Sequence, residues 1–224
     1  MRFFVRLILR MQLKKVPFSY MWILEKSIGK AKTILDLGTA DGALMEVLSK
    51  GHKWNITGID IYDKWLKLAE KKKVYKELKK GDLNPICKKF IRKKRKFDVV
   101  FCSQTIEHIN RKKGEELLDL SEKLAKKRIV FGTPRGYMYQ PKEFLGENPY
   151  QRHKSGWKEE DFLKRGYRVY GIGFRPVWSE EGLARTRNKL AHFIYTFISF
   201  IFAPLVYFYP NLGAGILCVK DVKK

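Results

Sequence analysis

The sequence predicts an α/β protein with a doubly wound, seven-stranded sheet that is mostly parallel and has an antiparallel last strand. Three observations support this fold class. Short β-type runs alternate with helical segments along most of the chain. Most of those runs are largely apolar, as in parallel strands that are buried on both faces. The 224 residues, 45% of them hydrophobic, suffice for one compact domain.

Each element follows from its local pattern. Strands are expected at residues 33–37, 55–59, 97–102, 128–133, 168–174 and 216–220, with a weaker, lysine-rich strand at 75–79. Helices are expected at 43–49, 62–72, 85–92, 112–125 and 158–164. An amphipathic helical segment at 1–30 precedes the main domain at 31–224, in which an apolar helical insertion or flap occupies 175–213.

The charge is strongly basic, with 47 Lys and Arg against 23 Asp and Glu, a net charge of +24. Such a surface attracts phosphates of nucleic acids or of anionic membranes, and it is also common in heat-adapted proteins. Much of the excess of basic residues lies in residues 71–96, mostly just before strands. Because ligands bind where the strands end, these residues are expected at the opposite edge of the sheet. Three scattered cysteines predict neither a disulfide framework nor a zinc site, which favours a reducing, cytoplasmic setting.

The most informative motif follows the first strand, where Asp36-Leu-Gly-Thr-Ala-Asp-Gly42 turns an apolar strand into a helix. Gly38 and Gly42 permit a tight turn and close approach of a ligand to the backbone. The second strand ends in Gly58-Ile-Asp60, the position at which nucleoside-binding α/β folds hydrogen-bond ribose hydroxyls. Ala40 replaces the second glycine of GxGxxG, and no GxxxxGK[ST] loop is present, which weakens nicotinamide and ATP interpretations.

These segments resemble class I S-adenosylmethionine-dependent methyltransferases, particularly the type 11 and quinone-biosynthesis-like small-molecule branch. Asp36–Gly42 is similar to motif I, and Gly81-Asp-Leu83, Phe97–Ile109, Arg128–Pro134 and Gly166–Val169 are similar to later segments in the same order. The resemblance covers residues 32–175 and implies a Rossmann-like fold with S-adenosylmethionine as cofactor. It implies cofactor contacts by Asp36, Gly38, Ala40, Gly42, Asp60, Ile61, Asp82, Leu83, Ser103 and Gln104.

Two histidines lie in loops at the predicted ligand edge. His153 is the leading candidate for a catalytic base, with a role in capping the next helix or in the substrate pocket as the alternative. A base is needed only where the acceptor must lose a proton. His108 is the second candidate, although in related families it more often packs the loop after the fourth strand. The Glu107-His108 pair resembles quinone O-methyltransferases, where a further acid completes a metal site. Gln104 stands at that acid's position, so no metal is predicted.

Aromatic residues suggest where an acceptor binds. Tyr137, Tyr139 and Trp157 are candidates for the walls of its pocket, with packing in the core as the alternative. Residues 190–209 contain no Asp, Glu, Lys or Arg. A single crossing of a bilayer would separate the last strand from its sheet, so we expect a hairpin that is broken near Pro204. It either dips into a membrane interface or packs as a buried helical pair.

The sequence therefore predicts a methyltransferase for a small-molecule or lipid acceptor, methylated at oxygen or carbon, with peripheral membrane contact through 190–209. The expected location is cytoplasmic, at the inner face of the membrane. An RNA methyltransferase that uses the basic surface is the first alternative, although the loop after the fourth strand lacks the Pro-Pro-aromatic pattern typical of base amino methylation. A non-catalytic membrane scaffold on the same fold is the second alternative. The oligomeric state is not predicted.

Overall fold

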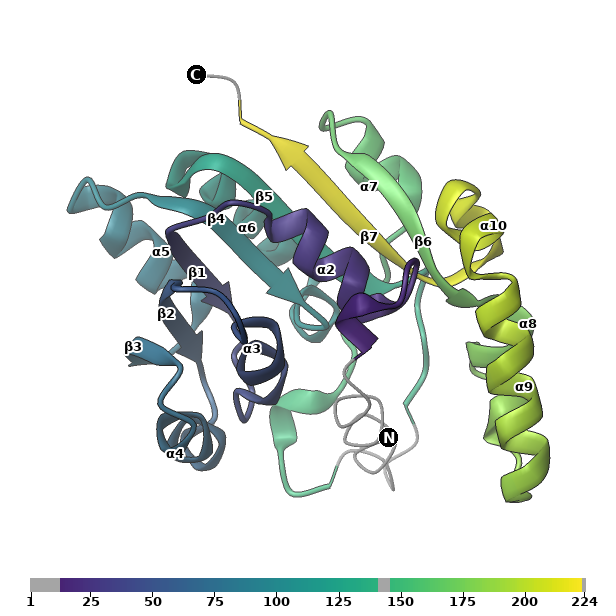
Figure 1. Ribbon diagram of the computed structural model, residues 1–224. Coiled ribbons are helices and arrows are strands. Elements are labelled where there is room, and N and C mark those ends of the chain that lie inside the picture. Colours follow the sequence, from purple (N-terminus) through teal and green to yellow (C-terminus); the bar gives the residue numbers. More distant parts are fainter. Residues whose placement is uncertain (1–12, 141–145, 223–224) are drawn as a thin grey trace.

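The computed structural model describes residues 13–140 and 146–222 and contains one seven-stranded sheet (Figure 1). Its strand order is β3-β2-β1-β4-β5-β7-β6. In chain order the strands are β1 (Thr33–Leu37), β2 (Asn55–Asp60), β3 (Tyr75–Lys80), β4 (Phe97–Ser103), β5 (Ala125–Pro134), β6 (Arg168–Phe174) and β7 (Gly213–Asp221). Strand β7 is antiparallel to both of its neighbours, β5 and β6, and the other pairs of neighbouring strands are parallel. The predicted fold class is confirmed.

Helices cover both faces of the sheet (Figure 1). On one face, α2 (Tyr20–Ile28) and α3 (Ala43–Leu48) pack in one core cluster, and α4 (Asp63–Lys71) lies beside α3. On the other face, α5 (Leu83–Arg92), α6 (Arg111–Leu124) and α7 (Glu159–Leu163) pack in a second cluster. Since the parallel strands end at a common edge, the loops that follow β1, β2, β4 and β5 meet there.

The predicted element boundaries agree closely with the structure. The weak strand at 75–79 exists as β3 and lies at the sheet edge, where its half-exposed positions accommodate lysines. Helix α5 begins before Pro85, which is tolerated because first-turn N–H groups have no partner within a helix. Strand β5 starts at Ala125, directly after α6, so no loop separates the two.

The N-terminal segment is described from residue 13 onward, so most of the helix predicted at its start lies outside the described residues. After a short 3-10 turn, η1 (Leu13–Lys15), the Ser19 side chain caps α2 by accepting from the N–H of Trp22. Helix α2 buries Met21, Ile23 and Leu24 against the sheet. It is therefore part of the core that β1 and β4 form.

The apolar insertion forms three α-helices, α8 (Arg175–Trp178), α9 (Lys189–Ile201) and α10 (Ala203–Phe208), and two short 3-10 helices, η5 (Leu183–Arg185) and η6 (Pro210–Leu212). The break falls at Phe202, with Pro204 in the first turn of α10, as predicted. Along the described ranges, no helix has both the length and the apolar character needed to cross a bilayer. Figure 1 shows α9 projecting past edge strand β6, while α10 lies against β6. Ser199 is the one buried side chain of α9, so the alternative of a fully buried helical pair is wrong.

Candidate functional site

The turn after β1 is built from left-handed backbone. Gly38 has φ +85°, and a Cβ there would lie 2.2 Å from Oγ1 of Thr105, so only glycine fits. Ala40, at φ +48°, holds a conformation that is uncommon for residues with a side chain. Gly42 at φ +75° begins α3. The turn therefore leaves its backbone accessible, as the glycine pattern predicted.

Asp60 ties this turn to the end of β2. One carboxylate oxygen accepts from the N–H of Ala40 and the other from the N–H of Tyr62, both at 2.8 Å. Burial raises the pKa of Asp60, and these backbone donors oppose the shift. Ile61, the next residue, is exposed. Asp60 is thus a brace of the turn as well as a candidate ligand for ribose.

Asp36 lies beneath the turn, buried at the end of β1. Its carboxylate accepts a 2.8 Å hydrogen bond from the hydroxyl of Tyr75, at the start of β3. Burial raises the pKa of Asp36 to about 7, the Tyr75 hydrogen bond lowers it, and the nearby charge of Asp60 raises it further. The sequence pattern gave no sign of the Tyr75 contact, because Tyr75 belongs to a different strand.

Asp82 and Leu83 stand at the start of α5. The Asp82 carboxylate pairs with the ammonium of Lys113 at 2.8 Å on the surface. The Leu83 side chain is buried in the core, so that only its backbone can contact a ligand. The predicted contact between Asp82 and an adenine amino group therefore competes with this ion pair.

Ser103 is the last residue of β4, and Gln104 follows it. The Ser103 hydroxyl is 2.5 Å from the hydroxyl of Tyr20, which comes from α2. Gln104 has φ +54° and donates its N–H to the carbonyl of Gly132 at 2.7 Å. Burial raises the pKa of Tyr20 to about 12, so its hydroxyl stays protonated. Sequence reasoning missed Tyr20, because α2 lies before the first recognisable motif.

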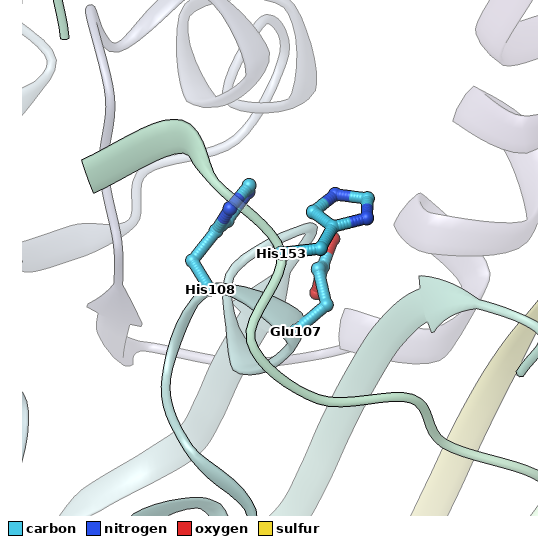
Figure 2. Close-up of side chains that lie close together, drawn as sticks. All are labelled: Glu107, His108 and His153. Carbon is cyan, nitrogen blue, oxygen red and sulfur yellow. The ribbon is translucent and has the colours of Figure 1, made fainter. Parts of the chain in front are cut away.

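The two candidate histidines, His108 and His153, lie next to each other in the structure. Figure 2 shows Glu107 and His108, from the short 3-10 helix η2 (Ile106–His108), beside His153 from the loop after β5. The ring centroids of His108 and His153 are 4.9 Å apart, and one ligand atom from each of the three residues lies within 4.8 Å of the others. We call these three residues the Glu-His-His cluster. The sequence predicted no metal, yet this set is chemically suited to hold one.

The electrostatics of the cluster favour neutral imidazoles. Burial lowers the pKa of His108 to about 4, with a further contribution from His153, and burial also lowers the pKa of His153. The Nδ1–H of His153 donates to the carbonyl of Met138 at 2.7 Å, which leaves Nε2 with a lone pair. Burial raises the pKa of Glu107 to about 8. Both histidines can therefore accept a proton or ligate a cation.

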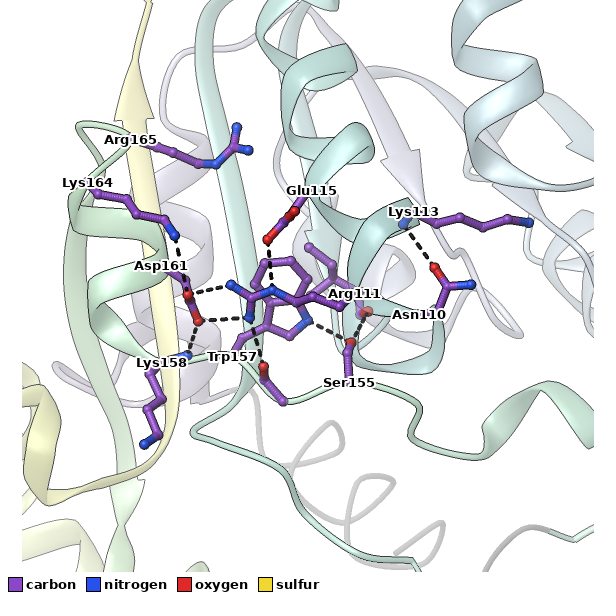
Figure 3. Close-up of polar contacts among 12 residues, drawn as sticks. Asn110, Arg111, Lys113, Glu115, Ser155, Trp157, Lys158, Asp161, Lys164 and Arg165 are labelled. Carbon is purple, nitrogen blue, oxygen red and sulfur yellow. Dashed lines mark hydrogen bonds and ion pairs between the residues drawn. The ribbon is translucent and has the colours of Figure 1, made fainter.

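The three predicted wall residues separate into two groups. Tyr137 and Tyr139 are exposed on the loop after β5 and remain available to an acceptor. Trp157 has no exposed surface and lies in the hydrophobic core, so it does not line an open pocket. The guanidinium of Arg111 lies over its ring at 4.0 Å, and its Nε1 donates to Ser155 (Figure 3). Trp157 fixes the loop that carries His153.

Taken together, the carboxyl edge of the sheet holds an accessible glycine turn, two buried carboxylates and a cluster of proton acceptors. Cofactor candidates come from the ends of β1, β2, β3 and β4 and the residues that follow them, and the cluster comes from the loops after β4 and β5. The arrangement can bind a nucleoside-like molecule at one end and place a nucleophile at the other.

Comparison with known proteins agrees with this geometry. A family model described as a methyltransferase domain matches residues 13–171. None of the curated proteins matches the sequence.

Solved structures share the fold. One is a SAM-dependent methyltransferase from Archaeoglobus fulgidus, with TM-score 0.54, 19% identity, and coverage of 89% of this chain and 93% of that one. Another is the N-terminal domain of EvdMO1 with SAH bound, with TM-score 0.55, 13% identity and 97% coverage of both chains. A third is magnesium protoporphyrin IX methyltransferase from Synechocystis with bound SAH, with TM-score 0.50, 14% identity and coverage of 90% and 79%.

Proposed function

Because this chain belongs to the family of methyltransferase domains, we propose that it transfers the methyl group of S-adenosylmethionine to a lipophilic acceptor at a membrane surface. The glycine turn and Asp60 support the choice of cofactor, and two of the structural neighbours were solved with SAH. Methyl transfer from a sulfonium needs positioning more than covalent help, because the leaving group is already activated. The cluster provides a base for an acceptor that carries a proton.

The observation that supports a lipophilic acceptor is the exposed apolar face of α9 and α10. We define this face by the residues Leu190, Phe193, Ile194, Phe197, Phe200, Ile201, Phe202, Leu205 and Phe208. Phe193 is 69% exposed and Leu190 is 68% exposed, although both are large and apolar. Monomeric proteins rarely leave such contiguous surface in water, so it marks a binding surface.

Charge and length favour a bilayer interface as the partner of this face. Arg175, Arg185, Arg187 and Lys189 are exposed next to it and can meet anionic headgroups, against two acidic residues, Glu180 and Glu181. With 13 residues, α9 can lie in an interface with its apolar side inward. Figure 1 shows α9 extending on the side toward which β1 and β4 point, which is the side of the site. A lipophilic acceptor would thus be delivered beside the cofactor.

Calorimetric titration with SAH tests the cofactor. We expect micromolar binding by the wild type and a loss of at least about tenfold in Asp60→Ala, since removing a carboxylate leaves two backbone donors without their acceptor. Asp63→Ala is the matched control, because Asp63 is about half-exposed and its ion pairs are with Lys67 and Lys80. A folded wild type that does not bind SAH would contradict the methyltransferase activity and favour the scaffold.

Flotation with vesicles containing anionic lipid tests the membrane surface. We expect the wild type to float and Phe193→Ser/Phe197→Ser to remain in solution. Leu68→Ser/Leu163→Ser removes two exposed leucines elsewhere and should still float. Equal flotation of both double variants would rule out the apolar face as the contact. A methylation assay that offers lipid extract or RNA as the acceptor tests the alternative. Methylation of RNA but not of lipid, with a rate that falls steeply as salt rises, would favour the RNA methyltransferase.

A further inference from the structure

The Glu-His-His cluster contains two buried polar atoms that no protein group satisfies among the described residues. Oε1 of Glu107 and Nδ1 of His108 are both inaccessible to solvent and lack a hydrogen-bond partner. Buried polar atoms are normally paired, because leaving one unpaired costs about 1–3 kcal/mol. Glu107 itself is only 2% exposed. The N–H groups of Thr105 and Glu107 lower the pKa of the Glu107 carboxyl, yet neither is hydrogen-bonded to Oε1. Two unpartnered polar atoms therefore lie in one cluster and remain available to a ligand.

The remaining atoms of the cluster are already oriented. Oε2 of Glu107 accepts from the hydroxyl of Thr133 at 3.1 Å, and Nδ1 of His153 donates to the Met138 carbonyl at 2.7 Å. Each contact uses one polar atom of its residue and leaves the other directed elsewhere. Metal-binding carboxylates and imidazoles characteristically have such outer hydrogen bonds, which fix the ring tautomer and the direction of the lone pairs.

The loop that carries His153 is held firmly against η2. The N–H groups of Lys154 and Ser155 donate to the carbonyl of Glu107 at 2.7 and 3.1 Å. The Ser155 hydroxyl contacts the carbonyls of Ile106 and Ile109. Figure 3 shows the next layer, in which Arg111 joins Trp157 of this loop to Asp161. The three ligand atoms are therefore held together by the fold.

From this geometry we propose that Glu107, His108 and His153 bind one divalent transition-metal ion of the Zn²⁺ class. Two imidazole nitrogens and one carboxylate oxygen are a donor set that suits zinc and neighbouring metals. Ligand atoms in a tetrahedral zinc site are separated by roughly 3.4 Å, as bond lengths of about 2.0–2.2 Å require. Ligand atoms that lie within 4.8 Å reach that spacing by small side-chain rotations.

The ion would also resolve the electrostatics of the cluster. A carboxylate that is removed from water needs an opposite charge, and the positive charge of the metal supplies it. Three protein ligands leave a fourth position open to an outside oxygen. On the proposed function, the metal-bound histidines would act as ligands in place of bases, and an acceptor hydroxyl at the open position would lose its proton to solvent. Its oxygen then bonds to the methyl carbon as the carbon–sulfur bond breaks, giving a methyl ether and SAH.

Zinc affinity of the tag-free protein, measured by competition with a chromogenic chelator, tests the site. We expect one ion per chain and at least tenfold weaker binding in His108→Gln and in His153→Gln. His52→Gln is the matched control, because His52 does not belong to the Glu-His-His cluster and pairs instead with Glu25. If a ligand variant fails to fold, Thr133→Val serves instead, and removing this outer hydrogen bond should weaken binding about 10–100-fold.

Two results would overturn the site: a folded wild type that takes up no stoichiometric zinc, or zinc affinity that is unchanged in His108→Gln, His153→Gln and Thr133→Val. SAH binding is measured on the same samples. Normal SAH binding without zinc binding would refute the metal site alone. Zinc binding that depends on both histidines, without SAH binding, would support the metal site and contradict the proposed cofactor.

Discussion

The two halves of the sheet differ in how far contacts within the chain fix the segments that follow their strands. In the half formed by β3, β2, β1 and β4, buried carboxylates and left-handed backbone hold the turn in one conformation, with Asp60 accepting from two backbone N–H groups. In the half formed by β5, β7 and β6, a long insertion carries large apolar side chains into solvent. The first half is closed by contacts within the chain. The second half leaves an apolar surface exposed.

This difference indicates a division of labour. A common cofactor requires the same few polar contacts in every member of a fold family, so the first half is constrained locally. The acceptor is particular to each protein, and its specificity is carried by loops and insertions on a shared scaffold. Substitutions in the glycine turn of the first half, or of Asp60, should therefore weaken or abolish SAH binding, whereas substitutions in the second half should leave SAH binding intact.

The largest effect is expected for Gly38→Ala. The new Cβ would lie 2.2 Å from Oγ1 of Thr105 and would also strain a backbone at φ +85°. We expect the free energy of unfolding to fall by about 3 kcal/mol or more and SAH binding to be lost. Chemical denaturation and calorimetry measure the two effects.

Gly51→Ala is the matched control for Gly38→Ala. Gly51 has nearly the same φ, +84°, but a Cβ there would meet no atom within 4 Å. It should cost only the backbone strain, about 1 kcal/mol, and leave SAH binding unchanged. Equal losses of stability in the two variants would show that backbone strain alone, rather than the contact with Thr105, makes the turn require glycine.

Gly171→Ala should give the next largest effect, and it lies in the other half. A Cβ on this β6 residue would lie 2.2 Å from the carbonyl oxygen of Val206 and so push α10 away from the sheet. We expect a loss of about 2 kcal/mol in unfolding free energy with normal SAH affinity. Loss of SAH binding in a folded Gly171→Ala protein would show that the halves are coupled.

The sequence predicted the first half better than the second, for physical reasons. Strand β1 and its glycine turn are recognisable locally, because an apolar run, two glycines and an acid at fixed spacing lie within ten residues. The Glu-His-His cluster has no such local signal. His153 reaches Glu107 only because its loop folds back onto η2, and Tyr20 reaches Ser103 from a helix before the first motif. Burial of Trp157 likewise depends on contacts with α6 that spacing does not reveal.

The pH dependence of stability offers a sharper test of the cofactor half. The pKa of Asp36 is raised to about 7 in the folded protein, so the native state binds a proton that the unfolded state releases near pH 4. Stability should therefore fall as pH rises from about 4 to about 7, by about 1 kcal/mol per pH unit from this group.

Asp36→Asn removes the titrating group while keeping an acceptor for Tyr75. We expect its unfolding free energy to change less than that of the wild type over this pH range and to exceed the wild-type value near pH 7. Asp63→Asn, at a half-exposed carboxylate, is the control and should follow the wild-type slope. A wild-type slope that Asp36→Asn does not alter would place the titration on another group.

The smallest effect concerns how the exposed helix of the second half is anchored. Ser199, the buried residue of α9, accepts hydrogen bonds from Nε1 of Trp178 at 2.7 Å and from the N–H of Phe174 at 3.3 Å. Ser199→Ala removes this acceptor and should lower the unfolding free energy by about 1 kcal/mol, with SAH binding unchanged. Thr196→Ala is its control, because the Thr196 hydroxyl donates only within the same helix, to the carbonyl of His192. If α9 is held chiefly by its polar anchor, Ser199→Ala should also increase hydrogen exchange in α9, whereas Thr196→Ala should not. Equal exchange in both variants would mean that ring stacking, such as Phe174 on Phe202 at 4.6 Å, holds the insertion to the sheet.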